Sequence, residues 1–366
     1  MTARTPSGGE IVKTLFSRWL SALIFLVPLD AAAGYSNLDV FGDSLTDSGN
    51  NAIALAPNVT PLPIPGNDFI PTFPYASGRY TNDEVWAQTL ASALGLAAAP
   101  SLLGGTDYAF GGAQTGPLTP NPLPGGLFAP FPPSLETQAA FFLAQHGNIA
   151  PATALYIVAG GGEDVLQALR SINGCGGSLG CVDTVIQATA EAFAGNIENI
   201  ISALQNAGAT NIVLWDVPDV GDAPVAHALG VSPLATAIAS SMNLALSSAI
   251  GTDPSIKLFD AFGLLDAVVA DPNMFGLVNV TDACAQFIAC DPSQYLFWDG
   301  IHPTSAADPI ITDAILSLIA EVPEPSTVAV LSVALVVLVF ARRRPPAVEA
   351  KVRDRSVRGG RPDGVR

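Results

Sequence analysis

FGDSLTDSGN, at residues 41–50, is the stretch of this chain that decides its fold. It closes the short apolar run Leu38–Phe41, so we expect a strand that ends in a Gly-Asp-Ser turn and passes into a helix. Such a turn would hold Ser44 at the carboxyl edge of a sheet, where open α/β folds bind ligands. A serine at a helix N-terminus also has backbone N–H groups beside it, ready to receive a developing oxyanion. The alternative interpretation is a helix cap rich in Ser and Asp.

Apolar runs alternate with helical patterns along the rest of the chain, and this alternation predicts an α/β fold. We expect one domain with a mainly parallel sheet of about five strands and helices on both faces. The predicted strands are Leu38–Phe41, Asp107–Phe110, Leu155–Ala159, Asn211–Val217 and Ile256–Phe259. The predicted helices are Val85–Leu94, Leu135–Gln145, Val182–Ala207, Pro233–Ile250 and Ser305–Ile319.

Two stretches rich in Pro and Gly, Ala56–Tyr75 and Gly116–Pro133, fit neither pattern. They are predicted to be long ordered loops, which in compact domains are often functional. Two interpretations stay open for them: an apolar wall around a substrate, or plain surface excursions.

The first 33 residues have the pattern of a secretory signal peptide. Basic residues precede the apolar run Trp19–Leu29, and Ala31–Ala33 then offers a small-residue cleavage site. The mature chain is therefore expected to begin near Gly34, outside the cytoplasm.

The other end carries a second apolar run, Thr327–Ala341, followed by the basic cluster Arg342–Arg344. A helix over this run would be roughly 22 Å long against roughly 30 Å of hydrocarbon, so it is a short membrane span at best. The arginines would hold its end on the cytoplasmic side. With Val322–Ser326 before it, this tail resembles the bacterial PEP-CTERM sorting signal, which implies an exosortase-type protease that removes residues 322–345 and a basic tail at 346–366.

The charge balance excludes nucleic acid as a partner of the central domain. Of 15 basic and 32 acidic residues in the chain, residues 34–321 hold 3 bases against 26 acids. A surface this acidic repels phosphates. Nine of the bases lie in residues 342–366, where the apolar run before them favours a cytoplasmic membrane flank.

The four cysteines fall into two closely spaced pairs, Cys175 with Cys181 and Cys284 with Cys290. In an exported chain disulfides are expected, and of the three possible connectivities we predict the two local loops. Zinc ligation is the alternative, but the chain has no CxxC and no histidine beside these cysteines.

LFWDGIHPT, at residues 296–304, supplies the residue types that a serine nucleophile needs. A nucleophilic serine requires a base to take its proton, and the base requires a carboxylate to fix its tautomer. Asp299 and His302 are three residues apart, and a tight turn at Gly300 can bring their side chains together. The fold then has only to place Ser44 opposite them.

Together these blocks resemble the GDSL or SGNH hydrolases, a lipase/esterase-like family with a three-layer α/β/α, flavodoxin-like fold. The resemblance covers roughly residues 36–320 and implies Ser44 as nucleophile, with Asp299 and His302 completing a triad. DYAFGGA at residues 107–113 resembles the second block of the family, whose glycine lends a backbone N–H to the oxyanion hole. Gly112 is the match, with Gly111 the alternative. Further matches are Gly78–Asn82 through Trp86, Pro218–Gly221, and Cys284–Trp298.

One block departs from the family, whose third block reads Gly-x-Asn-Asp with an Asn side chain that donates to the oxyanion. Here the stretch is Ala159–Asp164, and Glu163 stands where the Asn would be. An ionised Glu offers no donor. Three possibilities follow: Glu163 is protonated by burial and donates, or it turns away and water or backbone donates, or the site is impaired.

The predicted function is hydrolysis of acyl esters through Ser44, His302 and Asp299 by way of an acyl-enzyme, with no metal or cofactor. The substrate would be a lipid ester or an acetylated carbohydrate, and the location the periplasm, cell envelope or extracellular matrix of a Gram-negative bacterium. Two alternatives stay open: a catalytically weak surface or matrix protein that binds lipid or polysaccharide, and an exopolysaccharide acetyl esterase.

Other polar residues near these motifs are interpreted without a catalytic role. Asp43 and Asp47 are predicted to cap a helix and support the turn, and Asp308 to be an exposed helix acid. His146 is predicted to be a surface residue near a helix end, and His227 a polar loop residue.

Overall fold

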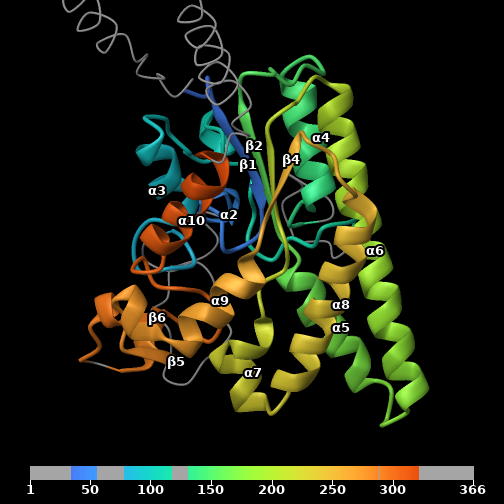
Figure 1. Ribbon diagram of the computed structural model, residues 1–366, viewed down its shortest axis with the longest axis vertical. Helices are drawn as coiled ribbons and strands as arrows, with labels where there is room; N and C mark the ends of the chain where they lie inside the picture. The colour runs from blue at the N-terminus through green and yellow to red at the C-terminus, as the bar shows by residue number, and fades with distance from the viewer. Residues whose placement is uncertain (1–33, 56–77, 118–130, 288, 321–366) are drawn as a thin grey trace, which may run out of the picture. The chain divides into compact units, whose positions relative to one another are not determined.

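The computed structural model of the chain describes residues 34–55, 78–117, 131–287 and 289–320 (Figure 1). The predicted signal peptide, most of the two proline-rich loops, and the predicted sorting signal and basic tail lie outside the described residues. The chain divides into residues 1–319 and residues 320–366, and of the second unit only Ala320 is described.

A parallel sheet of four strands in the order β1-β2-β3-β4 forms the centre of the first unit (Figure 1). Apolar residues fill β1, β2 and β3 almost throughout, as expected of strands covered on both faces. The strands are β1 Leu38–Gly42, β2 Leu155–Ala159, β3 Ile212–Trp215 and β4 Ile256–Phe259. Four of the five predicted strands are thereby confirmed within a residue or two.

The predicted fifth strand, Asp107–Phe110, is not a regular strand. Among the described residues the main sheet therefore has four strands and not the predicted five. The segment does run parallel to β1, because Tyr108 N–H donates to the Val40 carbonyl at 2.8 Å and Phe110 N–H to that of Gly42 at 3.2 Å. Its outer side is taken by the Asn50 side chain, whose amide donates to the carbonyls of Asp107 and Ala109. The Asn50 side chain therefore occupies the edge at which a further strand would form its hydrogen bonds.

Counting that segment, the order of parallel segments is second, first, third, fourth, fifth along the chain, which is the flavodoxin-like order. In this arrangement the connections leave the carboxyl ends of β1 and β2 in opposite directions. Ligands bind in the crevice at such a switch point. The chain just after β1 and just after β2 is therefore where a site is expected.

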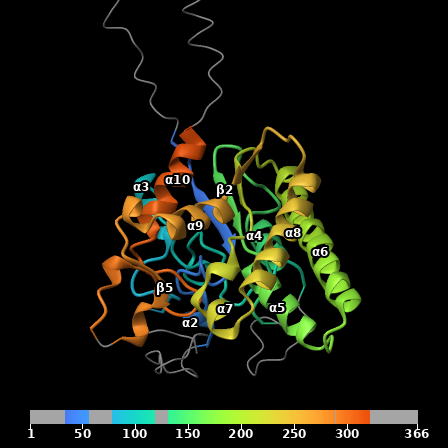
Figure 2. The same ribbon diagram turned by 60° about the horizontal axis from the view of Figure 1, so that its bottom comes forward.

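Helices cover both faces of the sheet and complete three layers (Figure 2). Alternate residues along the strands supply two apolar cores, one against α4, α6 and α8 and one against α3 and α10. The helices are α2 Asn50–Leu55, α3 Trp86–Ala93, α4 Leu135–Gln145, α5 Gly162–Asn173, α6 Leu179–Asn206, α7 Pro224–Leu229, α8 Ser232–Ile250, α9 Ala261–Ala270 and α10 Asp308–Ala320.

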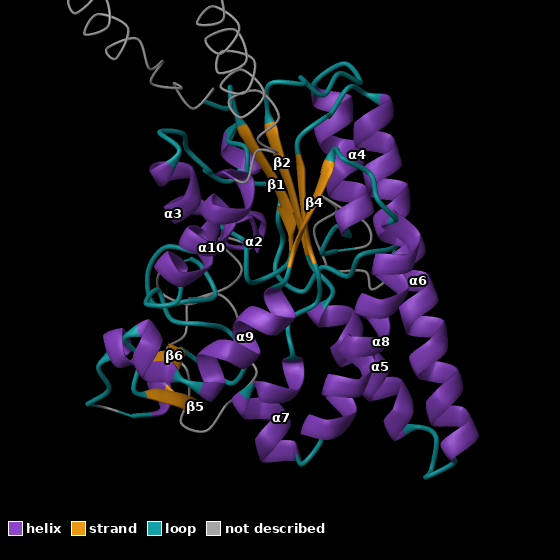
Figure 3. Ribbon diagram, viewed as in Figure 1, coloured by secondary structure: helices purple, strands orange, loops and turns teal. Residues whose placement is uncertain are grey.

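A small two-stranded parallel sheet stands apart from the main one (Figure 3). It pairs β5, Asn279–Ala283, with β6, Tyr295–Phe297, and β6 leads directly into the loop that carries Asp299 and His302. The disulfide Cys284–Cys290 closes the connection between the two strands, and Cys175–Cys181 closes the turn between α5 and α6. Both predicted local disulfides are confirmed.

By length and composition α8 is apolar enough to cross a membrane. Its buried face, which includes Ile238, Met242 and Leu246, belongs to the core against α6. The core helix of a folded domain can have the same length and composition, and α8 packs in the core of the described fold.

Candidate active site

The turn after β1 is held by contacts that only glycine allows at its first position. The amide of Gln138, which is buried on α4, accepts from Gly42 N–H and donates to the Gly42 carbonyl, both at 2.9 Å. A Cβ on Gly42 would lie 2.6 Å from Thr46 Oγ1 and 2.8 Å from the backbone oxygen of Ala159 on β2. The chain can therefore turn sharply here and present Ser44 at the carboxyl edge of the sheet.

Ser44 does not lie at a helix N-terminus, which corrects one expectation. The helix α2 begins only at Asn50. Asp47 separates the two, because its carboxylate accepts the backbone N–H groups of residues 49, 50 and 51. Asp43 Oδ1 likewise accepts Leu45 N–H at 3.0 Å. These two acids support the turn and the helix start, as predicted.

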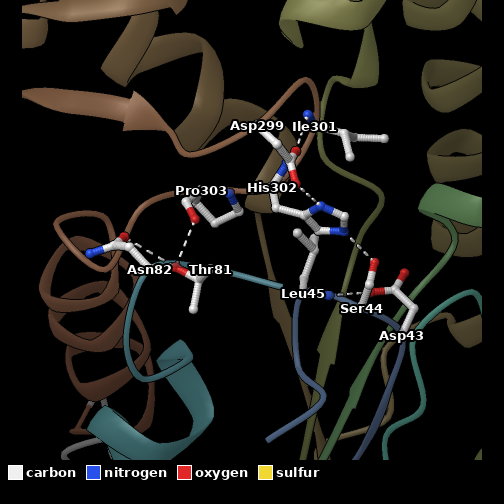
Figure 4. Close-up of polar contacts among 9 residues, drawn as sticks. All are labelled: Asp43, Ser44, Leu45, Thr81, Asn82, Asp299, Ile301, His302 and Pro303. Carbon is white, nitrogen blue, oxygen red and sulfur yellow. Dashed lines mark hydrogen bonds and ion pairs between the residues drawn. The ribbon is translucent and has the colours of Figure 1, made fainter. Parts of the chain in front are cut away.

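Ser44, His302 and Asp299 meet in one line of hydrogen bonds (Figure 4). His302 Nε2 lies 2.7 Å from Ser44 Oγ, and His302 Nδ1 lies 2.8 Å from Asp299 Oδ2. The other oxygen of Asp299 accepts the backbone N–H groups of Ile301 and His302, each at 2.7 Å. Asp299 is fully buried and His302 is 4% exposed. The backbone N–H groups of its own turn thus hold the Asp299 carboxylate in place, and the carboxylate orients the His302 imidazole.

A second segment, residues 80–82, supports His302 from the side. The ring of Tyr80 packs on the imidazole with centroids 5.0 Å apart. Thr81 Oγ1 donates to the Pro303 carbonyl at 3.0 Å (Figure 4). The Asn82 amide makes two 2.9 Å bonds with Ser305. The sequence matched this segment to the family block but did not indicate that it holds the base.

Gly111 and Gly112 differ in what their backbone can offer. Gly111 N–H donates to Asp47 Oδ2 and its carbonyl accepts from the Asn51 amide, both at 2.9 Å. Gly112 lines the cavity with φ at +78°, and its N–H has no acceptor among the described residues. Gly112 is therefore the better placed of the two to donate to a ligand.

Glu163 lies in the first turn of α5 and lines the same cavity. Its Oε1 is 2.7 Å from Arg170 Nη1, seven residues further along the helix. The Glu163 side chain is 22% exposed and that of Arg170 is 53% exposed. Of the three possibilities for Glu163, the contact with Arg170 favours the second, in which the carboxylate turns away and lies along its own helix.

The cavity measures about 600 Å³, within the usual range for small-molecule sites. Ser44, His302 and Gly112 line it on the side of the sheet, and residues of α5 and α7 line it farther out. Sequence patterns did not predict α5, because its first turn is glycine-rich and acidic, nor α7, which is only six residues long.

Burial raises the pKa values of the acids around Ser44. It raises the pKa of Asp43 to about 7; the Leu45 N–H bond and His302 oppose the shift, and Glu163 and Asp164 add to it. Burial also raises the pKa of Asp164 to about 6, against two bonds from Thr115. Asp43 and Asp164, the carboxyl groups near Ser44, therefore lose their protons as the pH rises through about 6 to 7.

His146, His227 and Asp308 take no part in the hydrogen bonds that join Asp299, His302 and Ser44. His146 caps the end of α4 and is exposed, as predicted, whereas His227 lies on the exposed face of α7 rather than in a loop. Asp308 is not exposed: it is 4% accessible, and burial with Glu84 and Asp83 nearby raises its pKa to about 8. The prediction missed this because Asp83 and Glu84, which lie near Asp308 in the structure, are far from it in the sequence.

One group of described carboxylates has the spacing of a cation site. Oxygen atoms of Asp219, Asp222 and Asp266 all lie within 4.8 Å of one another. Both oxygens of Asp219 already accept from the Thr236 hydroxyl.

Comparison with known proteins points in one direction. A sequence model of the family described as GDSL-like Lipase/Acylhydrolase matches residues 39–315. Esterase EstA of Pseudomonas aeruginosa is 28% identical over 345 aligned positions, covering 84% of this chain and 50% of that protein. GDSL esterase/lipase At5g42170 of Arabidopsis thaliana is 27% identical over 323 positions, covering 75% of this chain and 84% of that protein. The chain spans about half the length of the Pseudomonas relatives it matches.

Among solved structures, the lipase Lip_vut3 from a goat rumen metagenome aligns over 77% of this chain and 96% of its own. Its sequence identity is 14% and the TM-score is 0.41.

Proposed function

The chain belongs to the GDSL-like lipase/acylhydrolase family, and on this premise we propose that it is a serine hydrolase that cleaves carboxylic esters through Ser44, His302 and Asp299. The observation that carries the proposal is the unbroken line of hydrogen bonds from Asp299 through His302 to Ser44 Oγ. A buried carboxylate, an imidazole and a serine hydroxyl in this order form the arrangement that activates a serine nucleophile.

In the proposed mechanism His302 Nε2 takes the Ser44 proton as Oγ attacks the ester carbonyl. Asp299 accepts the Nδ1–H bond and stabilises the imidazolium that forms. The imidazolium then gives its proton to the departing alcohol, which leaves an acyl group on Ser44. Water, deprotonated by the same imidazole, attacks the acyl-enzyme and releases the carboxylic acid and free Ser44.

The oxyanion would be received by the backbone N–H groups of Ser44 and Gly112. With Glu163 paired to Arg170, no side-chain amide completes the hole at that position. Loss of one such donor costs on the order of 10²–10³ in rate. We therefore expect measurable but modest turnover on activated esters.

A fluorophosphonate probe tests the proposal, because it labels only a serine that its base can activate. We expect a covalent adduct on Ser44 in the full chain, located by mass spectrometry, and no adduct in Ser44→Ala. Ser48→Ala is the matched control, since Ser48 lies in the same turn and should leave labelling intact. A folded protein with an unmodified Ser44 would overturn the proposal.

A second candidate function rests on Glu163. A carboxylate in the donor's place could leave a catalytically weak protein that binds envelope lipid or polysaccharide. Turnover of p-nitrophenyl esters separates the two: activity lost in Ser44→Ala favours the enzyme, and equal background hydrolysis by both proteins favours the binding protein.

We also propose that the enzyme acts outside the cytoplasm and is held for a time at the membrane. Support comes from the signal-peptide pattern of residues 1–33 and the PEP-CTERM-like tail of residues 322–345. Cell fractionation of the full chain and of a chain ending at residue 321 tests this, because only the full chain should sediment with membranes before an exosortase-type protease removes the tail.

A further inference from the structure

One face of α5 lies in the cavity along the whole length of the helix. The side chains that line the cavity recur every three or four residues, whereas Val165 and Ala168 on the other face are buried in the core. This is the spacing of a single helix face. The side chains of α5 that line the cavity are those of Glu163, Leu166, Leu169, Arg170 and Asn173.

On α5 the apolar part of the lining is Leu166 and Leu169, whereas the opposite wall is apolar throughout. It is formed by Val225, Ala226 and Leu229 of α7 together with Val231. Leu229 is 67% exposed although it lines the cavity, so it stands at the opening with much of its surface in contact with water. Figure 1 shows α5 and α7 beyond the carboxyl edge of the sheet. Ser44 lies at that edge, because β1 ends two residues before it, at Gly42. The apolar surface formed by Leu166, Leu169 and the α7 residues thus extends outward from Ser44.

The length of this wall sets the size of what it can hold. From Glu163 to Asn173 the helix advances roughly 15 Å, at about 1.5 Å per residue. An extended alkyl chain advances by about 1.25 Å per carbon, because each C–C bond of about 1.52 Å is inclined to the chain axis. The wall therefore matches a chain of about twelve carbons.

The charge at the wall favours an uncharged occupant. Among the residues that the structure describes, Arg170 is the only Arg or Lys that lines the cavity, and Glu163 already pairs with it. Residues 34–321 otherwise hold 2 bases, Arg79 and Lys257, against 26 acids. An anionic ligand would enter a strongly negative field with its single cation already engaged.

We propose that the cavity along α5 binds the unbranched hydrocarbon chain of the ester, and that Leu166 and Leu169 determine the chain length accepted. This inference rests on the proposed esterase function of Ser44. The chain belongs either to the acyl group or to the alcohol, and two substrate series distinguish these sources.

Leu169→Trp tests the inference, because an indole at this position would block the cavity part-way along α5. In one series p-nitrophenyl esters vary in acyl length from about two to about twelve carbons; in the other, acetate esters vary in alcohol length over the same range. We expect kcat/KM of the wild type to rise with length in one series. In Leu169→Trp the shortest esters should keep their rates within about twofold, and esters of about eight carbons or more should lose at least about tenfold.

Two further variants make the result decisive. Leu229→Asp changes an exposed side chain at the opening, is compatible with folding, and should also weaken long esters selectively. Leu179→Trp, on α6 and 78% exposed outside the cavity, should leave both length profiles unchanged.

The outcomes separate the two proposals. If Leu169→Trp and Leu229→Asp are folded, hydrolyse short esters and keep the wild-type profile in both series, the inference about the hydrocarbon chain is overturned while the esterase function stands. If the wild type hydrolyses no ester of either series above the Ser44→Ala background, the esterase function itself fails.

Discussion

Glu163 is the residue at which this site departs from the family pattern. Where that pattern has an Asn amide, this chain has a carboxylate that pairs with Arg170. The carboxylate is drawn along α5 and brings no donor to the oxyanion. We predict that Glu163→Asn keeps or raises kcat on a short p-nitrophenyl ester, by up to about a hundredfold if the amide reaches the oxyanion.

Arg170→Met is the control for this variant, because it breaks the ion pair without supplying an amide. It should leave kcat on short esters near the wild-type value. A large fall in kcat of Glu163→Asn at an unchanged melting temperature would show instead that the carboxylate has a role of its own.

Single residues at this site were predictable only where the signal was local. Asp299 and His302 are three residues apart, and the turn that joins them could be anticipated from Gly300. Gln138 and Tyr80 could not, because their roles depend on long-range contacts: Gln138 meets Gly42 across 96 residues, and Tyr80 packs on an imidazole from the far end of the domain.

At the scale of elements, the junction between β1 and the nucleophile turn depends on the space around Gly42. We predict that Gly42→Ala lowers the free energy of unfolding by about 1–3 kcal/mol, since the backbone oxygen of Ala159 cannot move aside cheaply. It should also lower kcat, because Ser44 follows two residues later.

Gly195→Ala is the matched control for the same substitution. Gly195 lies inside α6 with open space around its Cα, so alanine there should stabilise the protein by about 0.5–1 kcal/mol. Urea unfolding and ester turnover measure both variants. Equal stability of the two would contradict the packing explanation.

The last turn of α10 depends on β4. Lys257 Nζ donates to the carbonyl of Leu318 at 2.8 Å, and a cation there also complements the helix dipole. We predict that Lys257→Met, which keeps the length of the side chain, lowers the free energy of unfolding by about 1 kcal/mol, and that Lys257→Arg restores most of it. A Met variant as stable as the wild type would show that water replaces the bond at no cost.

Elements were predictable in proportion to the regularity of their patterns. The boundaries of β2, β4 and α4 match the predicted ranges. The helix α5 was missed although it forms a wall of the cavity, since glycines and acids at its start hide the helical period. The segment at 107–110 was predicted as a strand because apolar alternation does not reveal that Asn50 occupies its outer edge.

At the scale of the whole molecule, buried carboxyl groups make stability depend on pH. Burial is the largest cause of a raised pKa in several of them: Asp39, Asp47, Asp164 and Asp216 at about 6, Asp43 at about 7, Asp308 at about 8, and Asp107, whose pKa lies well above its ordinary value. The folded state keeps protons that the unfolded chain releases near pH 4. Their contribution to stability is therefore complete below about pH 4 and is lost as the pH rises through 6 to 8.

We accordingly predict that the free energy of unfolding falls as the pH rises from about 5 to about 8, measured by urea unfolding at constant ionic strength. Asp308→Asn should flatten this slope by about 1 kcal/mol per pH unit, since it removes one such proton. Asp313→Asn, an exposed position on the same helix, is the control. A stability maximum near pH 8 would contradict the prediction.

The order of the proposed catalytic residues along the chain has a consequence for synthesis. Ser44 and His302 are 258 residues apart, and Asp299 and His302 come after every strand of the main sheet. A ribosome that has completed the sheet has already made the nucleophile but not its base. Under the proposed mechanism, a nascent or prematurely terminated chain ending before residue 299 is inert toward esters. The proposed activity therefore arises only when the domain is complete.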